Sequence, residues 1–110
     1  MRFKIMLLVA SSSVLAFAGA ASAASQGDMS DTKYIAVAHC AGIAEGVGAD
    51  ATPFSEVLKA QANSRLGEVI DRADEARADA KRDAAHAGAD GKAGYARQLD
   101  GACKSYLSQG

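Results

Sequence analysis

Hydrophobic residues recur at helical spacing in several stretches of the chain, which predicts amphipathic helices. The first predicted helix runs from about residue 31 to Glu45, and its broad apolar face includes Tyr34, Val37 and Cys40. Ser30 or Asp31 can cap its start, because either side chain can accept a hydrogen bond from a free amide of the first turn. So wide an apolar surface is typical of the central helix of a bundle.

A loop from Gly46 to Thr52 separates the first helix from the second, and the glycines at 46 and 48 suit a helix C-terminus. Thr52 and Pro53 predict a new start, with Thr52 as the N-cap and Pro53 at the first helical position. One straight helix over residues 53–87 would be about 50 Å long. If Cys40 and Cys103 form a disulfide, their Cα atoms must lie within about 7 Å of each other, and a break near Asn63, Ser64 or Gly67 removes most of the offset between them. One uninterrupted helix is the alternative, and it requires a nearly fully extended loop over residues 46–52. We therefore favour four helices.

Between residues 71 and 94 no hydrophobic residue is larger than alanine, and a last helix is predicted from about 92 to 108. Small side chains at three- and four-residue spacing allow another helix to approach closely. We expect this stripe to pack against the last helix of the same chain, which carries Gly94 and Ala102. A homodimer contact through the stripe is the alternative. The stripe consists of Ala73, Ala76, Ala80, Ala84 and Ala87.

The first 23 residues have the pattern of a cleavable signal peptide. Arg2 and Lys4 form a basic start, residues 5–20 are uncharged and mostly apolar, and Ala21-Ser22-Ala23 fits a signal peptidase site. An uncleaved membrane anchor is the alternative. Serines interrupt the apolar run and no basic residue closes it, so we expect cleavage and a periplasmic or secreted protein without a stable membrane anchor.

Residues 24–110 are then a single domain, of which 24–30 form a polar lead-in. This part has 20 alanines but only 16 residues of the Val, Ile, Leu, Met, Phe and Tyr set. Domains with so small a core often need a covalent staple, and an exported chain can form one. We predict an all-α fold: a small antiparallel bundle of three to four helices, stapled by one disulfide between Cys40 and Cys103.

Charge narrows the range of partners. Arg2 and Lys4 account for two of the 12 basic residues, so the predicted mature part has 10 against 13 acidic ones, a net charge of −3. Without a basic excess, nucleic acid and anionic lipid surfaces are not expected partners. An acidic row recurs every four residues and is a candidate contact for a basic protein partner, or a solvated face offset by neighbouring Arg72, Arg77, Lys81 and Arg82. This row consists of Asp71, Glu75, Asp79 and Asp83.

The sequence shows no catalytic or cofactor motif. It lacks a CxxC redox pair, a CxxCH haem attachment and an HExxH zinc motif. His39 follows no metal-ligand spacing relative to His86, so both are weak metal candidates, together with Met29. We expect no catalytic residues, no metal and no cofactor, and hence a protein that is not an enzyme.

These observations favour a small exported non-enzymatic protein that binds another macromolecule, such as an inhibitor, an immunity-type protein or a stress chaperone. The alternative is a periplasmic module that binds a metal or a small ligand.

Overall fold

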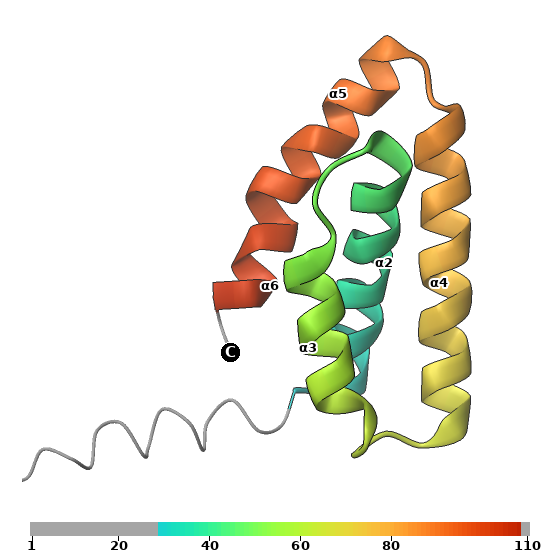
Figure 1. Cartoon of the computed structure of the whole chain (residues 1–110), viewed down its shortest axis with the longest axis vertical. Coiled ribbons are helices and arrows are strands. Elements are labelled where there is room, and N and C mark those ends of the chain that lie inside the picture. Colours follow the sequence, from blue (N-terminus) through green and yellow to red (C-terminus); the bar gives the residue numbers. More distant parts are fainter. Residues whose placement is uncertain (1–28, 109–110) are drawn as a thin grey trace, which may run out of the picture.

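The computed structural model describes residues 29–108, and every regular element in this part of the chain is helical (Figure 1). The last three elements cover residues 89–108 without interruption, and we call this segment the C-terminal arm, or the arm. Successive units run in alternating directions, as Figure 1 shows. The predicted all-α fold with four helical units is therefore confirmed. The elements are α2 (Asp31–Val47), α3 (Thr52–Ala62), α4 (Gly67–His86), α5 (Ala89–Gln98), the π-helical turn η1 (Leu99–Cys103) and α6 (Lys104–Ser108).

The predicted signal peptide at residues 1–23 lies outside the described residues, as does the lead-in up to residue 28. Within residues 29–108, no helix combines the length and the apolarity needed to span a bilayer.

Both ends of α2 are capped. The hydroxyl oxygen of Ser30 accepts a hydrogen bond from the Lys33 amide at 3.1 Å, which satisfies one free N–H of the first turn. Gly48 ends the helix with a φ of 80°, a left-handed conformation that glycine adopts without steric cost. The helix therefore extends two residues beyond the predicted end at Glu45, and Gly46 lies inside it.

The start of α3 differs from the prediction by one residue. Ala51 is the N-cap, and Thr52 is already the first helical residue. The helix starts one residue earlier because the Ala51 carbonyl oxygen already accepts hydrogen bonds from the Phe54 and Ser55 amides, at 3.1 and 3.0 Å. The Asp50 carboxylate accepts a hydrogen bond from the Thr52 amide at 3.0 Å, which forms an Asx turn before the helix. Pro53 lies in the first turn, as predicted.

The predicted break after the second helix is present. The chain leaves the helical path between the end of α3 at Ala62 and the start of α4 at Gly67. At the break, the Ser64 hydroxyl donates a hydrogen bond to the Gln61 carbonyl oxygen at 3.1 Å. Such a local polar bond competes with helix continuation and is typical of turns. Leu66, a large hydrophobic residue in the same segment, is 71 % exposed.

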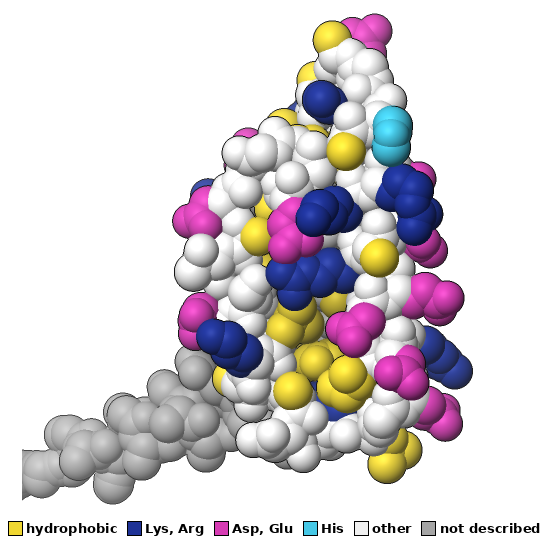
Figure 2. All heavy atoms as spheres, turned by 45° about the vertical axis from the view of Figure 1, so that its right-hand side comes forward, with side chains coloured by type: hydrophobic (Ala, Val, Ile, Leu, Met, Phe, Trp, Pro, Cys, Tyr) yellow, Lys and Arg dark blue, Asp and Glu magenta, His cyan; other side chains and the backbone are white. Residues whose placement is uncertain are grey.

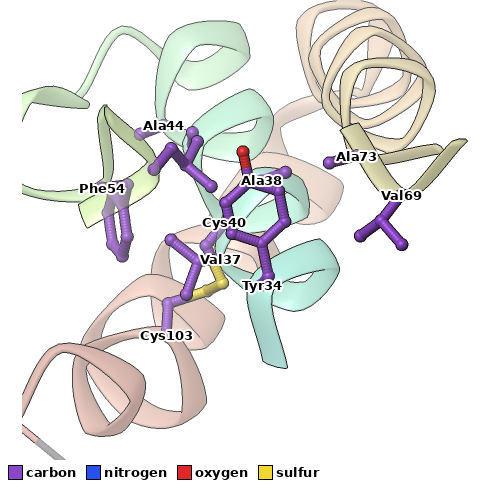
Figure 3. Packing of buried hydrophobic residues seen from close by; sticks show 11 residues of the cluster. Tyr34, Val37, Ala38, Cys40, Ala44, Phe54, Val69, Ala73 and Cys103 are labelled. Carbon is purple, nitrogen blue, oxygen red and sulfur yellow. A yellow bond between two sulfur atoms is a disulfide. The ribbon is translucent and has the colours of Figure 1, made fainter. Parts of the chain in front are cut away.

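α2 is the central helix, as its composition predicts, because α3, α4 and the arm all pack against it (Figure 1). Val37 and Ile43 are completely buried. Figure 3 shows the side chains of α2 between Phe54 of α3 on one side and Val69 and Ala73 of α4 on the other. The buried cluster consists of Tyr34, Val37, Ala38, Cys40, Ala41, Ala44, Phe54, Leu58, Val69, Ala73 and Cys103.

Two glycines of α2 allow α4 to approach closely. A Cβ atom added at Gly42 would overlap the carbonyl oxygen of Arg77. A Cβ atom added at Gly46 would lie 2.6 Å from the carbonyl oxygen of Lys81. Glycines four residues apart lie on the same helix face. The backbone of α4 therefore rests directly on this face of α2.

The alanine stripe lies on the other side of the same contact. Ala73, Ala80 and Ala84 are no more than 3 % exposed, whereas Ala76 and Ala87 are partly exposed. The expectation that the stripe packs against the last helix was wrong. α4 packs mainly against α2, because the glycines of α2 offer it a closer approach. The homodimer contact stays a prediction, although three of its five alanines are already covered within one chain.

The C-terminal arm is joined to α2 by the predicted disulfide between Cys40 and Cys103 (Figure 3). The two sulfur atoms are 2.07 Å apart and the Cα atoms 5.7 Å apart, across 63 positions of sequence. Cys103 is 2 % exposed, whereas neither α5 nor α6 contains a buried residue. The arm starts at Ala89, three residues before the predicted start.

Candidate functional site

A hollow lies between the arm and the turn that joins α2 to α3, and we call it the arm groove. It is open to solvent and has a volume of about 690 Å³. One wall is the segment from the end of α2 to the start of α3, and the other is one side of the arm. The lining residues are Val47, Gly48, Ala49, Asp50, Pro53, Phe54, Ala89, Lys92, Ala93, Ala96, Leu99, Asp100, Lys104 and Leu107.

The arm groove has a mostly apolar surface and four charged residues in its lining. Phe54 and Leu99 are among its large hydrophobic lining residues. Its charged residues are two carboxylates and two ammonium groups, so the groove carries no net charge. Apolar surface with a few polar groups is typical of binding sites in proteins. The charged lining residues are Asp50, Lys92, Asp100 and Lys104.

Local sequence explains both walls. On the arm, Ala93 and Ala96 are too small to reach across to the opposite wall and leave the space open. On the other wall, the Asx turn at Asp50 orients the loop, and the hydrogen bond from the Thr52 amide lowers the pKa of the Asp50 carboxyl. Asp50 is therefore an anion in the lining of the groove at neutral pH.

A second, smaller hollow lies beside the disulfide, and we call it the disulfide hollow. Its volume is about 350 Å³, and both Cys40 and Cys103 line it. α2, α4 and the arm all contribute to its walls. Four lining residues carry hydrogen-bonding side-chain atoms, namely Thr32, His39, Gln98 and Tyr106. The π-helical turn η1, a distortion often found at functional sites, supplies part of one wall.

The weak metal candidates fall in different surroundings. His39 is exposed and lines the disulfide hollow. His86 is exposed at the end of α4, where its Nδ1 atom lies 2.8 Å from the carbonyl oxygen of Arg82. Met29 precedes α2 and packs against the core. No group of three or more His, Cys, Asp or Glu side chains suited to a metal ion occurs within residues 29–108.

All four members of the acidic row, Asp71, Glu75, Asp79 and Asp83, are exposed. They lie on α4 away from the buried alanines that face α2. Figure 2 shows acidic and basic side chains mixed along this edge of the molecule. Asp79 pairs with Arg82 at 3.1 Å, as its spacing predicts, and both side chains are 60 % exposed. The row is thus a solvent-exposed face with neighbouring counter-charges, and its role as a partner contact stays a prediction.

Arg77 joins three helices through an ion pair and a hydrogen bond that the sequence did not predict. Arg77 of α4 donates to both carboxylate oxygens of Glu45 in α2, at 2.6 and 3.3 Å, and to the hydroxyl of Ser55 in α3 at 3.2 Å. These bonds lower the pKa of Glu45. Spacing suggested only that Arg77 offsets the neighbouring acidic row. Helical spacing gives no signal for a partner 32 positions away.

Arg65 was missed for the same reason. Its side chain is only 6 % exposed, although its partner Asp31 is 59 % exposed. The guanidinium donates to Asp31 at 2.7 Å and to the Gln61 side-chain oxygen at 2.8 Å, and its Cζ lies 5.0 Å from the centre of the Tyr34 ring. Burial raises the pKa of Tyr34. The cluster fastens the start of α2 to the break between α3 and α4, and this role is structural.

Comparison with known proteins does not connect these features to a family. No family model matches the chain, and no curated protein and no solved structure matches it either. The arm groove and the disulfide hollow are therefore interpreted from their own geometry.

Proposed function

We propose that this protein is an exported, non-enzymatic binding protein that holds an amphipathic helical segment of another protein in the arm groove. The observation that supports this most directly is the groove itself, which combines a mostly apolar surface with lining residues of both charges. Helix-in-groove recognition uses the same elements: a hydrophobic helix face enters the groove, and polar groups at the edge fix its orientation.

The dimensions of the groove favour a helix over a compact small molecule. Its lining residues on the arm extend from Ala89 to Leu107, which corresponds to about 27 Å along a helix. One additional helix in this position would contact α3 and the arm together. Because Asp50 and Asp100 balance Lys92 and Lys104, we expect a partner helix that carries both acidic and basic residues beside its apolar face.

Export is part of the proposal and has separate support. The pattern of residues 1–23 is that of a signal peptide, and a disulfide is compatible with an oxidising compartment. The assignment as a non-enzymatic protein rests on the sequence, in which no catalytic or cofactor motif was found.

The disulfide hollow favours a second candidate function, the binding of a small, largely apolar ligand. Its volume of about 350 Å³ suits a small organic molecule. The side chains of Thr32, His39, Gln98 and Tyr106 can hydrogen-bond to such a ligand. Thermal stabilisation of wild-type protein by a small-molecule library, lost in His39→Trp, would favour this candidate.

The test of the main proposal uses a fluorescent amphipathic helical peptide of about 18 residues, with leucines on one face and alternating glutamate and lysine on the other. We expect saturable binding to the oxidised protein, measured by fluorescence anisotropy. Ala96→Arg places a long charged side chain in the groove and should weaken binding at least ~10-fold, a loss of about 1.4 kcal/mol. Ala78→Arg is the matched control, because Ala78 is an exposed alanine of α4 that does not line the groove.

Equal affinities of the two variants would contradict the assignment of the groove, and so would the absence of saturable binding to wild-type protein. Circular dichroism of both variants checks that the helical content is preserved.

A further inference from the structure

The arm groove depends on a covalent bond that lines the disulfide hollow, the Cys40–Cys103 disulfide. Eight of the 14 residues that line the arm groove belong to the arm, so the groove exists only while the arm is in place. The position of the arm in turn depends on what attaches it to α2.

Noncovalent attachment of the arm is weak. Among the described residues of the arm, Cys103 alone is buried, since α5 and α6 contain no buried residue. Three further hydrophobic residues of the arm pack against the core but are only partly buried: Leu99, Tyr106 and Leu107. In contrast, α4 buries Val69 and three alanines against α2 without a covalent link. Segments with few buried contacts open at lower free energy than the rest of a fold.

Both cysteine side chains are fully buried, although Cys40 and Cys103 line the disulfide hollow, whose volume is about 350 Å³. His39 and Gln98 lie at the same hollow. Exchange of thiols and disulfides requires access to one of the two sulfur atoms. A dithiol that enters the hollow therefore reaches a sulfur atom when the weakly held arm opens locally.

We propose that the Cys40–Cys103 disulfide is a redox latch: its reduction by a dithiol releases the arm and dismantles the arm groove, while α2, α3 and α4 stay folded. The functional consequence rests on the proposed function of the groove, because loss of the groove then means release of the partner helix.

The chemistry balances with a dithiol as the reductant. One thiolate of the dithiol attacks a sulfur of the disulfide, which breaks the S–S bond and forms a mixed disulfide. The second thiol of the reductant then displaces the remaining cysteine. The two electrons come from the dithiol, which becomes a cyclic disulfide, and its two protons pass to Cys40 and Cys103, which become free thiols.

Hydrogen–deuterium exchange of the mature protein, with and without dithiothreitol, tests the latch without any partner. On reduction we expect exchange in residues 89–108 to become faster by at least ~100-fold, as for a segment that opens freely. Exchange in α2 and α4 should change by less than ~3-fold, since their contact does not involve the disulfide. A Cys40→Ala, Cys103→Ala double variant should show the fast arm at all times and should not respond to dithiothreitol.

Two outcomes of this experiment would overturn the latch. If the arm keeps its protection against hydrogen exchange after reduction, its noncovalent contacts hold it in place. If the whole chain loses protection, the disulfide stabilises the entire fold and not the arm alone.

The same samples, titrated with the amphipathic peptide, separate the latch from the proposed function. We expect reduction to weaken peptide binding at least ~10-fold. Unchanged binding by reduced protein would overturn the latch alone. A released arm together with no peptide binding by the oxidised protein would overturn the proposed function and leave the release itself established.

Discussion

The contact between α2 and α4 and the contact between α2 and the arm are built in opposite ways. At the first, Gly42 and Gly46 allow the backbones to meet, and no covalent bond is needed. At the second, the disulfide of Cys103 supplies the attachment, and the helices on either side of it bury no residue completely. The arm groove and the disulfide hollow both involve the arm.

The α2–α4 contact therefore contributes mainly to stability, whereas the contact with the arm leaves space for binding. Close packing of small residues fills the space between α2 and α4 and leaves no room for a ligand. The arm packs less closely on the rest of the bundle, and small side chains such as Ala93 and Ala96 line the space that remains. This space is the candidate site. The substitutions below test whether the two contacts differ as much in energy as they do in structure.

Gly42→Leu should have the largest effect. The new side chain meets the backbone of α4 at Arg77, which cannot move without separating the two helices. Overpacking usually costs 1–3 kcal/mol, and a clash with backbone should exceed this, so we expect a loss of more than about 4 kcal/mol. Urea unfolding followed by far-ultraviolet circular dichroism measures it.

The matched control is Gly101→Leu in the arm. A Cβ atom at Gly101 has no neighbour within 4 Å, and leucine has the higher helix propensity. Stability should therefore stay constant or rise by up to about 1 kcal/mol. Similar losses in the two variants would show that the contacts do not differ as proposed.

A pair of truncations should give the next largest difference. Ile43 is completely buried in α2, so Ile43→Ala should cost about 2–5 kcal/mol of unfolding free energy. Leu99 of the arm is only partly buried, and Leu99→Ala should cost about 1 kcal/mol or less in oxidised protein. Thermal and urea unfolding of both variants under oxidising conditions provide the comparison. A larger loss for Leu99→Ala would mean that the arm carries much of the core energy.

Periodicity predicted the elements of this fold well, but it predicted their neighbours less well. The broad apolar face of α2 identified the central helix, and the distance requirement of the disulfide located the break after Ala62. The stripe on α4 was correctly recognised as a packing surface, but it was assigned to the wrong helix. Several helices offered small residues, and only their arrangement in space selects α2 as the partner.

The candidate site was not predictable in the same way. The arm groove is a space left between two segments at least 35 positions apart, and no residue pattern marks such a space. The ion pairs of Arg65 and Arg77 join residues 34 and 32 positions apart, beyond any helical period. Both are consequences of tertiary arrangement. The acidic row was visible in the sequence because all of its members belong to one helix.

A pH-dependent contribution is expected from Glu45, which belongs to the α2–α4 contact. Hydrogen bonds from Arg77 lower its pKa in the folded protein below the ordinary value of 4.5. The pair therefore stabilises the fold above about pH 4.5, and this contribution disappears as the pH falls through the lower, folded pKa. Glu45→Gln should cost about 1 kcal/mol at pH 7 and much less at pH 3, measured by urea unfolding.

The exposed Glu75 provides the control, and Glu75→Gln should change the unfolding free energy at pH 7 by at most about 0.5 kcal/mol. A Glu45→Gln effect that does not change between pH 7 and pH 3 would contradict the role of this ion pair.

The smallest effect on stability is expected from reversing two charges of the acidic row. Glu75→Lys combined with Asp79→Lys removes one exposed ion pair, that of Asp79 with Arg82, which is worth at most about 0.5 kcal/mol. Thermal unfolding should therefore hardly change. Peptide binding in the arm groove should not change either, because neither residue lines it. If the acidic row is a partner contact, this double variant loses capture of the natural partner while Ala96→Arg retains it, and the reverse result assigns the contact to the groove.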